Sequence, residues 1–321
     1  GEGDDVPALA FVAFQMMFAI ITPALITGAF AERFKFKTYL IFLVLWSTLV
    51  YSPITHWVWA DNGWLLELGA LDFAGGTVIH INAGIAAVAA ALIVGKRRNP
   101  GLQPNNVPYV VLGAAILWFG WFGFNAGSAL AANDSAANAF IVTNVAAATA
   151  ALTWGLVSQL RTGKMGAVGV ATGAVAGLVA ITPAAGAVGP VGSIAIGFGA
   201  GIICFFAVEL IHKTGMDDAL DVFAVHGIGG IWGAIATGIF AVSVVTGGTE
   251  GLIEGGNIKQ VGIQAVGVVA TLVYSGVVSL IILFILDKIP GLGLRSSESD
   301  EDLGLDLASH GEQATVRDGA D

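Results

Sequence analysis

Long apolar runs set the strongest constraint on how this chain of 321 residues can fold. Each run is roughly 20 residues long, the length at which a helix crosses the hydrocarbon core of a lipid bilayer. The runs are continuously apolar and do not alternate with period two, which favours helices over a barrel. Charged residues make up 11% of the sequence, whereas a soluble domain carries about 25%. We therefore predict an all-α, polytopic membrane helix bundle surrounded by lipid.

The apolar runs predict about nine membrane-spanning helices within a transmembrane domain over residues 1–290. The predicted spans are residues 6–30, 38–58, 73–95, 107–128, 136–160, 165–181, 191–211, 219–245 and 261–286. Residues 291–321 are predicted to form an acidic tail. From Ser296 onward this tail holds eight acids and one base, Arg317. Such a charge argues against binding to nucleic acid.

Basic residues mark one side of the predicted bundle. Of the 13 Lys and Arg residues, 12 lie in alternate loops and in the tail, and only Lys259 lies in the other set of loops. Loops rich in Lys and Arg stay in the cytoplasm. We therefore predict a plasma-membrane protein whose N-terminus lies outside and whose acidic tail is cytoplasmic.

Two of the predicted spans carry a histidine behind an acid. Asp72 precedes His80 in the third span, and Asp221 precedes His226 in the eighth. An ionisable residue inside a membrane is expensive to insert and suggests a function. One such histidine is often only a structural residue bonded to a carbonyl, but two at matched depth favour a polar track in which imidazoles share a proton. A metal site is less favoured, because no third or fourth ligand lies nearby in the sequence.

The two histidine helices are predicted to run in opposite directions, because five steps along the chain separate them. Similar helices of opposite direction are typical of an inverted repeat with its site near the membrane midplane. A repeat of five helices that ends in a histidine helix fits the fourth to eighth spans. Only three spans fill the first repeat, so the sequence predicts that two helices are missing before Val6 and that the chain is a fragment or a short form.

The acids at the mouths of these helices have two interpretations. Asp favours the N-cap of a helix and complements its dipole, and we prefer this role for Asp221. For Asp72, on the outer side, a part in shaping a cation site carries equal weight. An aromatic face can also hold a small cation, and Ser128 could add a hydroxyl acceptor. The aromatic candidates are Phe18, Trp59, Trp121, Phe122 and Phe124.

Several motifs together resemble one protein family, the ammonium transporters (Amt/Mep/Rh), and in particular their bacterial and archaeal Amt branch. The motifs are residues 14–19, 28–33, 69–82, 121–128 and 221–227, with a tail segment at 304–312. The resemblance covers about residues 6–312. It implies a homotrimer with one pore in each subunit, and typically eleven spans. It also implies that PII-type signalling proteins bind the cytoplasmic face.

The same resemblance implies roles for individual residues. An outer ammonium site is implied at Trp59 and Ser128, with Phe18 lining it and Asp72 beneath it. Phe18 and Phe124 together resemble the stacked phenyl gate of this family. The implied twin-histidine pair is His80 and His226.

The function that follows is transport of ammonium, in which NH4+ is held outside, loses a proton and passes as NH3 through an apolar pore. Neither a cofactor nor an enzymatic activity is implied. An ammonium sensor of the same fold is the alternative, although the short acidic tail holds no signalling domain. An enzyme or a metal transporter built on intramembrane His and Asp is a third interpretation, and the lack of a denser ligand cluster counts against it.

Overall fold

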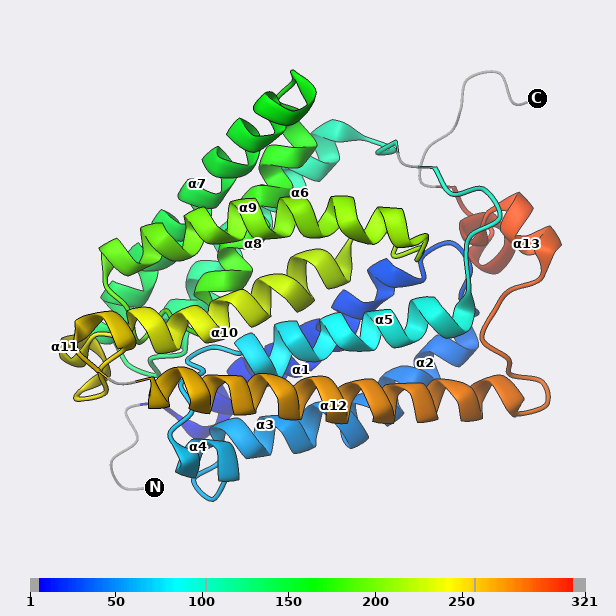
Figure 1. Ribbon diagram of the computed structural model, residues 1–321. Helices are drawn as coiled ribbons and strands as arrows, with labels where there is room; N and C mark the ends of the chain where they lie inside the picture. The colour runs from blue at the N-terminus through cyan, green and yellow to red at the C-terminus, as the bar shows by residue number, and fades with distance from the viewer. Residues whose placement is uncertain (1–5, 102, 257, 314–321) are drawn as a thin grey trace.

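The computed structural model describes residues 6–101, 103–256 and 258–313. Within these residues the regular elements are all helical, and the only paired extended segments form a single bridge between Phe34 and Arg295. The prediction of an all-α membrane bundle is confirmed. Figure 1 shows many of the helices running roughly along one direction, whereas the green helices within residues 107–181 are strongly tilted relative to them.

Among the described residues, eight helical segments are long and apolar enough to cross a membrane. They are Ala8–Ala29 (α1 with η1), Phe36–Leu68 (α2, η2, α3 and α4), Gly76–Val94 (η3 and α5), Val107–Gly127 (α6), Asp134–Thr162 (α7), Pro190–Thr214 (α9), Phe223–Phe240 (η4 and α10) and Lys259–Lys288 (α12). The sixth predicted span is the shorter apolar helix α8, Ala167–Ile181. The short helices at the two ends of the bundle are α11 (Ser243–Thr246), η5 (Leu252–Glu254), α13 (Glu298–Leu303) and η6 (Asp306–His310).

Most predicted boundaries lie within a few residues of the observed ones, but the eighth span is shorter than predicted. It begins at Phe223 and ends at Phe240, whereas the apolar run suggested residues 219–245. Asp221 has a positive φ of 56° and interrupts the helix on one side. On the other side the backbone is extended at Val242, whose N–H donates to the carbonyl of Ala187.

The two histidine-bearing segments run in opposite directions, as the inverted repeat requires. The guanidinium of Arg33 donates to the carbonyl of Gly95, just after α5, and to the carbonyl of Asp217, just before η4. One helix therefore ends where the other begins. We call this side of the bundle, which also holds α13, the Arg33 end, and the opposite side, which holds α4 and α11, the Asp72 end (Figure 1).

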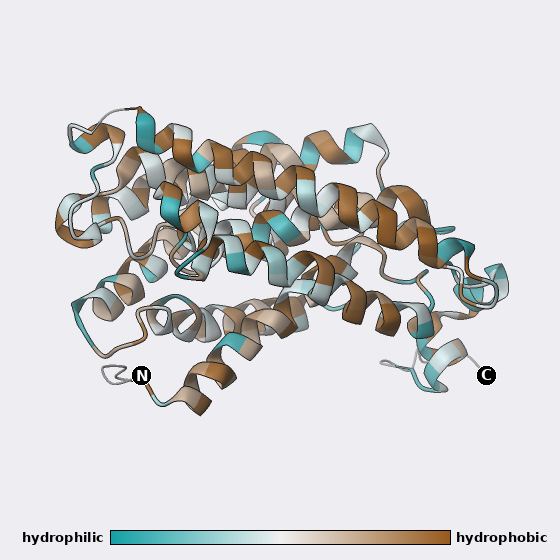
Figure 2. Cartoon of the chain, turned by 90° about the horizontal axis from the view of Figure 1, so that it is seen from below, coloured by the Kyte–Doolittle hydropathy of each residue, from teal (hydrophilic) through white to brown (hydrophobic). Residues whose placement is uncertain are grey.

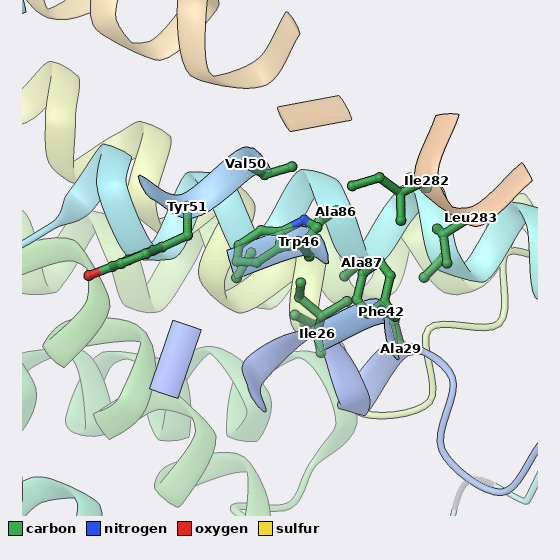
Figure 3. Packing of buried hydrophobic residues seen from close by; sticks show 14 of the residues in the cluster. Ile26, Ala29, Phe42, Trp46, Val50, Tyr51, Ala86, Ala87, Ile282 and Leu283 are labelled. Atoms are coloured by element: carbon green, nitrogen blue, oxygen red, sulfur yellow. The ribbon is translucent and has the colours of Figure 1, made fainter. Parts of the chain in front are cut away.

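The largest buried cluster joins the first helices to α5 and α12, which lie side by side. Alanines on α5 let large side chains approach its backbone closely, as small residues do between membrane helices. Figure 3 shows this packing around Ile26, Ala29, Phe42, Trp46, Ala86, Ala87, Ile282 and Leu283. The Trp46 Nε1–H donates to Ser279 Oγ at 2.9 Å, so this buried polar group is satisfied.

Hydrophobic residues cover the long helices, while hydrophilic residues gather at the connecting segments and on α13 (Figure 2). Part of the acidic tail folds back onto the Arg33 end. Leu294 is buried, and its carbonyl accepts from the N–H of Lys35. Arg98 pairs with Glu298 and Asp302 of α13. The last residues of the tail, 314–321, lie outside the described residues.

Candidate functional site

Two π-helical turns place the histidines that the sequence singled out. His80 lies on η3 (Gly76–Ile81), which continues into α5, and His226 lies on η4 (Phe223–Ile228), which continues into α10. The π-turn is rare and is often found at functional sites. Here both turns point a histidine inward, and the two Nδ1 atoms approach to 3.2 Å. The structure therefore brings together the two residues predicted to form a pair.

Glycines allow this close approach. Gly84 of α5 lies against the backbone of Gly227, and a Cβ atom at Gly84 would collide with it. Gly230 holds the matching position on α10, four residues after His226, and a Cβ there would lie 3.0 Å from Ile81 Cγ1 and 3.1 Å from His80 Cβ. The two histidine helices thus cross with almost no side-chain layer between them.

The histidine pair constrains where its protons lie. A contact between two Nδ1 atoms is a hydrogen bond only if one carries a proton and the other offers a lone pair. With both rings neutral, the partners are therefore opposite tautomers. The Nε2 of His80 is buried and has no hydrogen-bond partner among the described residues, so this atom is left to accept or donate toward a small polar solute.

Aromatic rings lie along one side of His80. Trp121 is nearly parallel to the imidazole, with centroids 5.4 Å apart and planes at 19°, and Phe124 lies 6.0 Å away at 14°. Trp121 is fixed by its Nε1–H, which donates to Thr182 Oγ1 at 2.9 Å. Both rings come from α6, so this helix lines the approach to the histidines.

The next ring toward the Asp72 end is Phe18 of α1, which is 2% exposed. Its centroid lies 4.7 Å from that of Phe124 and 5.6 Å from the ring of Trp59. The planes of Phe18 and Phe124 meet at 68°, so the stacking expected of these two phenyl rings takes an edge-to-face form. The structure thus joins Trp59, Phe18, Phe124 and His80 in one continuous series of ring contacts.

Two further candidates differ in how they relate to this series. Ser128 follows Phe124 by one turn, and its hydroxyl donates to the Phe124 carbonyl at 2.9 Å, which leaves its oxygen lone pairs able to accept. Phe122 belongs elsewhere, because its ring stacks on Phe140 of α7 at 4.0 Å. It lies two residues from Phe124 on the same helix, and such residues do not share a face.

Asp72 caps the helix that carries His80. Its carboxylate accepts five hydrogen bonds, from the N–H groups of Gly75, Gly76, Thr77 and Val78 and from the Thr77 hydroxyl. Burial raises the pKa of Asp72, and the donors oppose this because they favour the ionised form. The Asp72 carbonyl accepts from Trp59 Nε1–H at 2.8 Å. Asp72 thus acts on the aromatic site indirectly, by holding Trp59.

The counterpart of Asp72 in the second half is Asp218, not Asp221. Asp218 Oδ2 accepts from the N–H of Phe223, five residues on, as Asp72 does from Thr77. The N-cap interpretation of Asp221 is therefore wrong, and its Oδ1 instead lies 2.7 Å from His212 Nε2. The signal for Asp218 was present in the sequence, because both acids precede their histidine by eight residues.

The acids of the second half also differ in their electrostatics. Burial raises the pKa of Asp218 to about 6, and its Oδ1 has no hydrogen-bond partner within the part of the chain that the structure describes. Burial also raises the pKa of Asp221, although His212 opposes the shift. Among the residues that the structure describes, no group of three or more His, Cys, Asp or Glu side chains could hold a metal ion.

Comparison with known proteins gives one family. The model of the Ammonium Transporter Family matches residues 2–315. The chain is 56% identical to an ammonium transporter of Aquifex aeolicus, over 96% of this chain and 72% of that protein. It is 47% identical to the ammonium transporter Amt1 of Archaeoglobus fulgidus, over 98% of this chain and 78% of that protein.

A solved structure agrees with these sequence matches. The crystal structure of Candida albicans Mep2 superposes with a TM-score of 0.87 at 44% identity, over 92% of this chain and 68% of that one. The match in fold and the family model over nearly the whole sequence both point to a family of membrane transporters, which is not a class of enzymes. This chain belongs to the ammonium transporter family.

Proposed function

We propose that this chain moves ammonium across the plasma membrane by separating NH4+ into NH3 and a proton. The observation that carries this proposal is the contact of 3.2 Å between His80 Nδ1 and His226 Nδ1 inside an apolar bundle. It supplies neutral donors and acceptors in series, which suits a small neutral amine. An intact ammonium ion would incur a desolvation penalty of several kcal/mol in such surroundings.

The aromatic series is the proposed recruitment site. Trp59 and Phe18 offer ring faces that attract a cation, worth up to about 2 kcal/mol where water is excluded, and Ser128 offers a hydroxyl acceptor. Phe18 and Phe124 form the proposed gate between this site and His80. NH4+ loses its proton here, and NH3 continues along the histidines. The proton either returns to the outside or crosses separately through the pair of imidazoles. K+ has no proton to lose, so the same pore rejects it.

The proposed orientation follows the basic loops. The Asp72 end faces outside and receives ammonium, whereas the Arg33 end faces the cytoplasm, as its Arg and Lys residues favour. Residues 1–290 form the transporter domain and residues 291–321 the cytoplasmic tail. The working unit is proposed to be a homotrimer, and a PII-type signalling protein is the proposed partner at the Arg33 end.

The test is ammonium-evoked current in proteoliposomes that hold the chain, with K+ and methylammonium as comparison ions. We expect current with NH4+ and none with K+. His80→Ala and His226→Ala each remove one side of the Nδ1 contact, and we expect them to abolish the ammonium current or to admit K+. Phe122→Ala is the matched control on the lining helix, because its ring packs against Phe140 and away from the series.

Silence from the parent chain would be resolved with radiolabelled methylammonium. Uptake without current means that the proton returns to the outside, so the carried species is neutral overall. If neither uptake nor current is observed, the proposal is contradicted, and ammonium sensing becomes the function to test. Equal NH4+ and K+ currents in the parent chain would also overturn it, because the pore would then carry intact ions.

A further inference from the structure

Gln264 is a polar side chain buried inside the apolar helix α12. It is 3% exposed, and it contacts a segment 193 residues away in the sequence. Its Oε1 accepts from the N–H of Leu71 at 2.8 Å, and its Nε2–H donates to the carbonyl of the same residue at 2.7 Å. The amide therefore pairs with both polar groups of one residue, much as a neighbouring β-strand would.

The hydrogen-bonding capacity of this amide is fully used. The second Nε2 proton goes to the carbonyl of Ala234 at 3.1 Å, and Oε1 also receives a longer bond of 3.4 Å from Gln260. An amide has two donors and two acceptor sites, so none is left over. The orientation of the Gln264 amide is also fixed, because the N–H of Leu71 requires an acceptor and its carbonyl requires a donor. Among the side chains of similar size, only an amide or a protonated carboxyl meets both needs.

The place of this contact matters more than its strength. Leu71 directly precedes Asp72, whose carbonyl holds Trp59 and whose carboxylate starts the His80 helix. Ala234 belongs to α10, the helix that continues from His226. One uncharged side chain thus connects the aromatic site at the Asp72 end with the helices of both histidines. Buried polar groups without such a partner are costly, so the Leu71 peptide has little freedom to shift while Gln264 is present.

We propose that Gln264 is a positioning residue for ammonium binding, which acts by fixing the Leu71–Asp72 backbone and, through it, Trp59. It does not touch the substrate. This inference rests on the proposed function, and it adds a determinant of affinity that lies outside the ring series. Loss of Gln264 loosens the recruitment site but leaves the histidine contact in place. Its effect therefore falls on the apparent KM for methylammonium more than on the maximal rate.

Gln264→Leu tests this directly in proteoliposomes of the full chain. The change keeps the approximate volume and removes the donors and acceptors, so both polar groups of Leu71 lose the bonds that Gln264 makes to them and the Ala234 carbonyl loses its additional donor. We expect the KM for methylammonium to rise about tenfold, with a maximal rate within about twofold of the parent value. Gln159→Leu is the matched control, because Gln159 is exposed on α7 and its side chain donates to the nearby Gly163 carbonyl, far from the Leu71 peptide in the sequence. We expect its KM to equal that of the parent.

Gln264→Glu provides a readout that a loss of stability would not produce. A protonated carboxyl presents one donor and one acceptor, as the amide does, whereas a carboxylate has no donor and repels the Leu71 carbonyl. Burial keeps such a carboxyl protonated well above its usual range. We expect the ratio of variant KM to parent KM to fall toward one as the pH falls from about 8 to about 5.5. Methylammonium itself stays protonated throughout, and Gln264→Leu has no such dependence.

The outcomes separate this inference from the proposed function. If the parent chain does not transport, the proposed function fails first. If the parent transports and Gln264→Leu keeps its KM, or loses only maximal rate, the positioning role is wrong. Where Gln264→Leu does not insert into the membrane, the pH series of Gln264→Glu alone decides, and a constant KM ratio contradicts the proposal.

Discussion

Asp72 and Asp218 hold the same position in the two halves of the molecule, yet they are satisfied very differently. Each precedes its histidine by eight residues and accepts from a backbone N–H five residues on. Asp72 accepts five hydrogen bonds. Asp218 keeps one oxygen for which the described residues offer no hydrogen-bond partner. The repeated sequence pattern thus preserves where the acid lies but not how strongly it is held.

The difference teaches which end of the molecule is built to stay fixed. At the Asp72 end the cap, Trp59 and Gln264 all converge on residues 71 and 72. At the Arg33 end a carboxylate that is buried and only partly bonded is poorly stabilised. We infer that the proposed recruitment site demands a rigid frame, whereas the Arg33 end tolerates a less stable one. Three predictions test this contrast, in order of decreasing expected effect.

Asp72→Ala is expected to have the largest effect. It leaves four N–H groups and a hydroxyl without their acceptor, and unsatisfied buried groups cost about 1–3 kcal/mol each, with partial relief by relaxation. We expect the free energy of unfolding in detergent to fall by about 4 kcal/mol and uptake of methylammonium to be lost. Thermal unfolding followed by tryptophan fluorescence measures the first, and labelled uptake the second. An effect no larger than that of Asp218→Ala would contradict the contrast between the two ends.

The paired glycines of the helix crossing give the next effect. A Cβ at Gly84 would meet the backbone of Gly227, which cannot rotate away, whereas a Cβ at Gly230 would meet mostly side-chain atoms of Ile81 and His80. Forced overpacking costs about 1–3 kcal/mol. We expect Gly84→Ala to lower the free energy of unfolding by about 3 kcal/mol, the upper limit of this range, and Gly230→Ala to lower it by about 1 kcal/mol, the lower limit. Unfolding of the two variants side by side is the measurement, and the reverse order would show that the halves cross differently.

Asp218→Asn gives the smallest effect and a pH dependence of known sign. Because burial raises the pKa of Asp218 to about 6 in the folded state, the folded protein binds this proton more tightly than the unfolded chain does. The contribution of Asp218 to the free energy of unfolding therefore rises as the pH falls from about 7 toward about 4, by at most about 3 kcal/mol. Asp218→Asn keeps an acceptor for Phe223 and removes the charge, so we expect a flatter pH profile and higher stability at neutral pH.

The measurement is the melting temperature of the parent and Asp218→Asn chains over that pH range, taken as a difference. The difference isolates Asp218 from Asp72 and Asp221, whose pKa values burial also raises. A constant difference across the range would mean that Asp218 is satisfied after all. The two ends would then be more alike than their contacts indicate.

The sequence was a good guide to whatever depends on local pattern. Apolar runs predict the spans because each helix must satisfy its own backbone in lipid, and the matched depth of His80 and His226 predicts their pairing. It was a poorer guide to Asp221, because closeness to a helix start does not decide which acid caps it, and Asp218 accepts from the N–H of Phe223 instead. It was also a poor guide to Phe122, because residues two apart on a helix face different sides and this ring packs on Phe140.

Long-range contacts set the limit of such prediction. Gln264 lies in an apolar run and carries no motif, and its role arises only when α12 meets Leu71, 193 residues away. Asp218 could have been found from the repeat, since the spacing of eight residues is present in both halves. No local pattern indicates that α5 and η4 touch through Gly84 and Gly227, because glycines are abundant throughout the chain.

The glycine crossing also has a mechanical meaning. Two stiff helices that touch at one point share a fulcrum there, and when one half of the bundle rocks against the other, atoms near the fulcrum move least. Gly227 directly follows His226, and Gly84 lies one turn beyond His80. Rocking would therefore widen or narrow the two mouths while the gap between the imidazoles stayed almost constant. The centre of the proposed pore would then keep a fixed width, and changes of width would fall on the segments to either side of the two imidazoles.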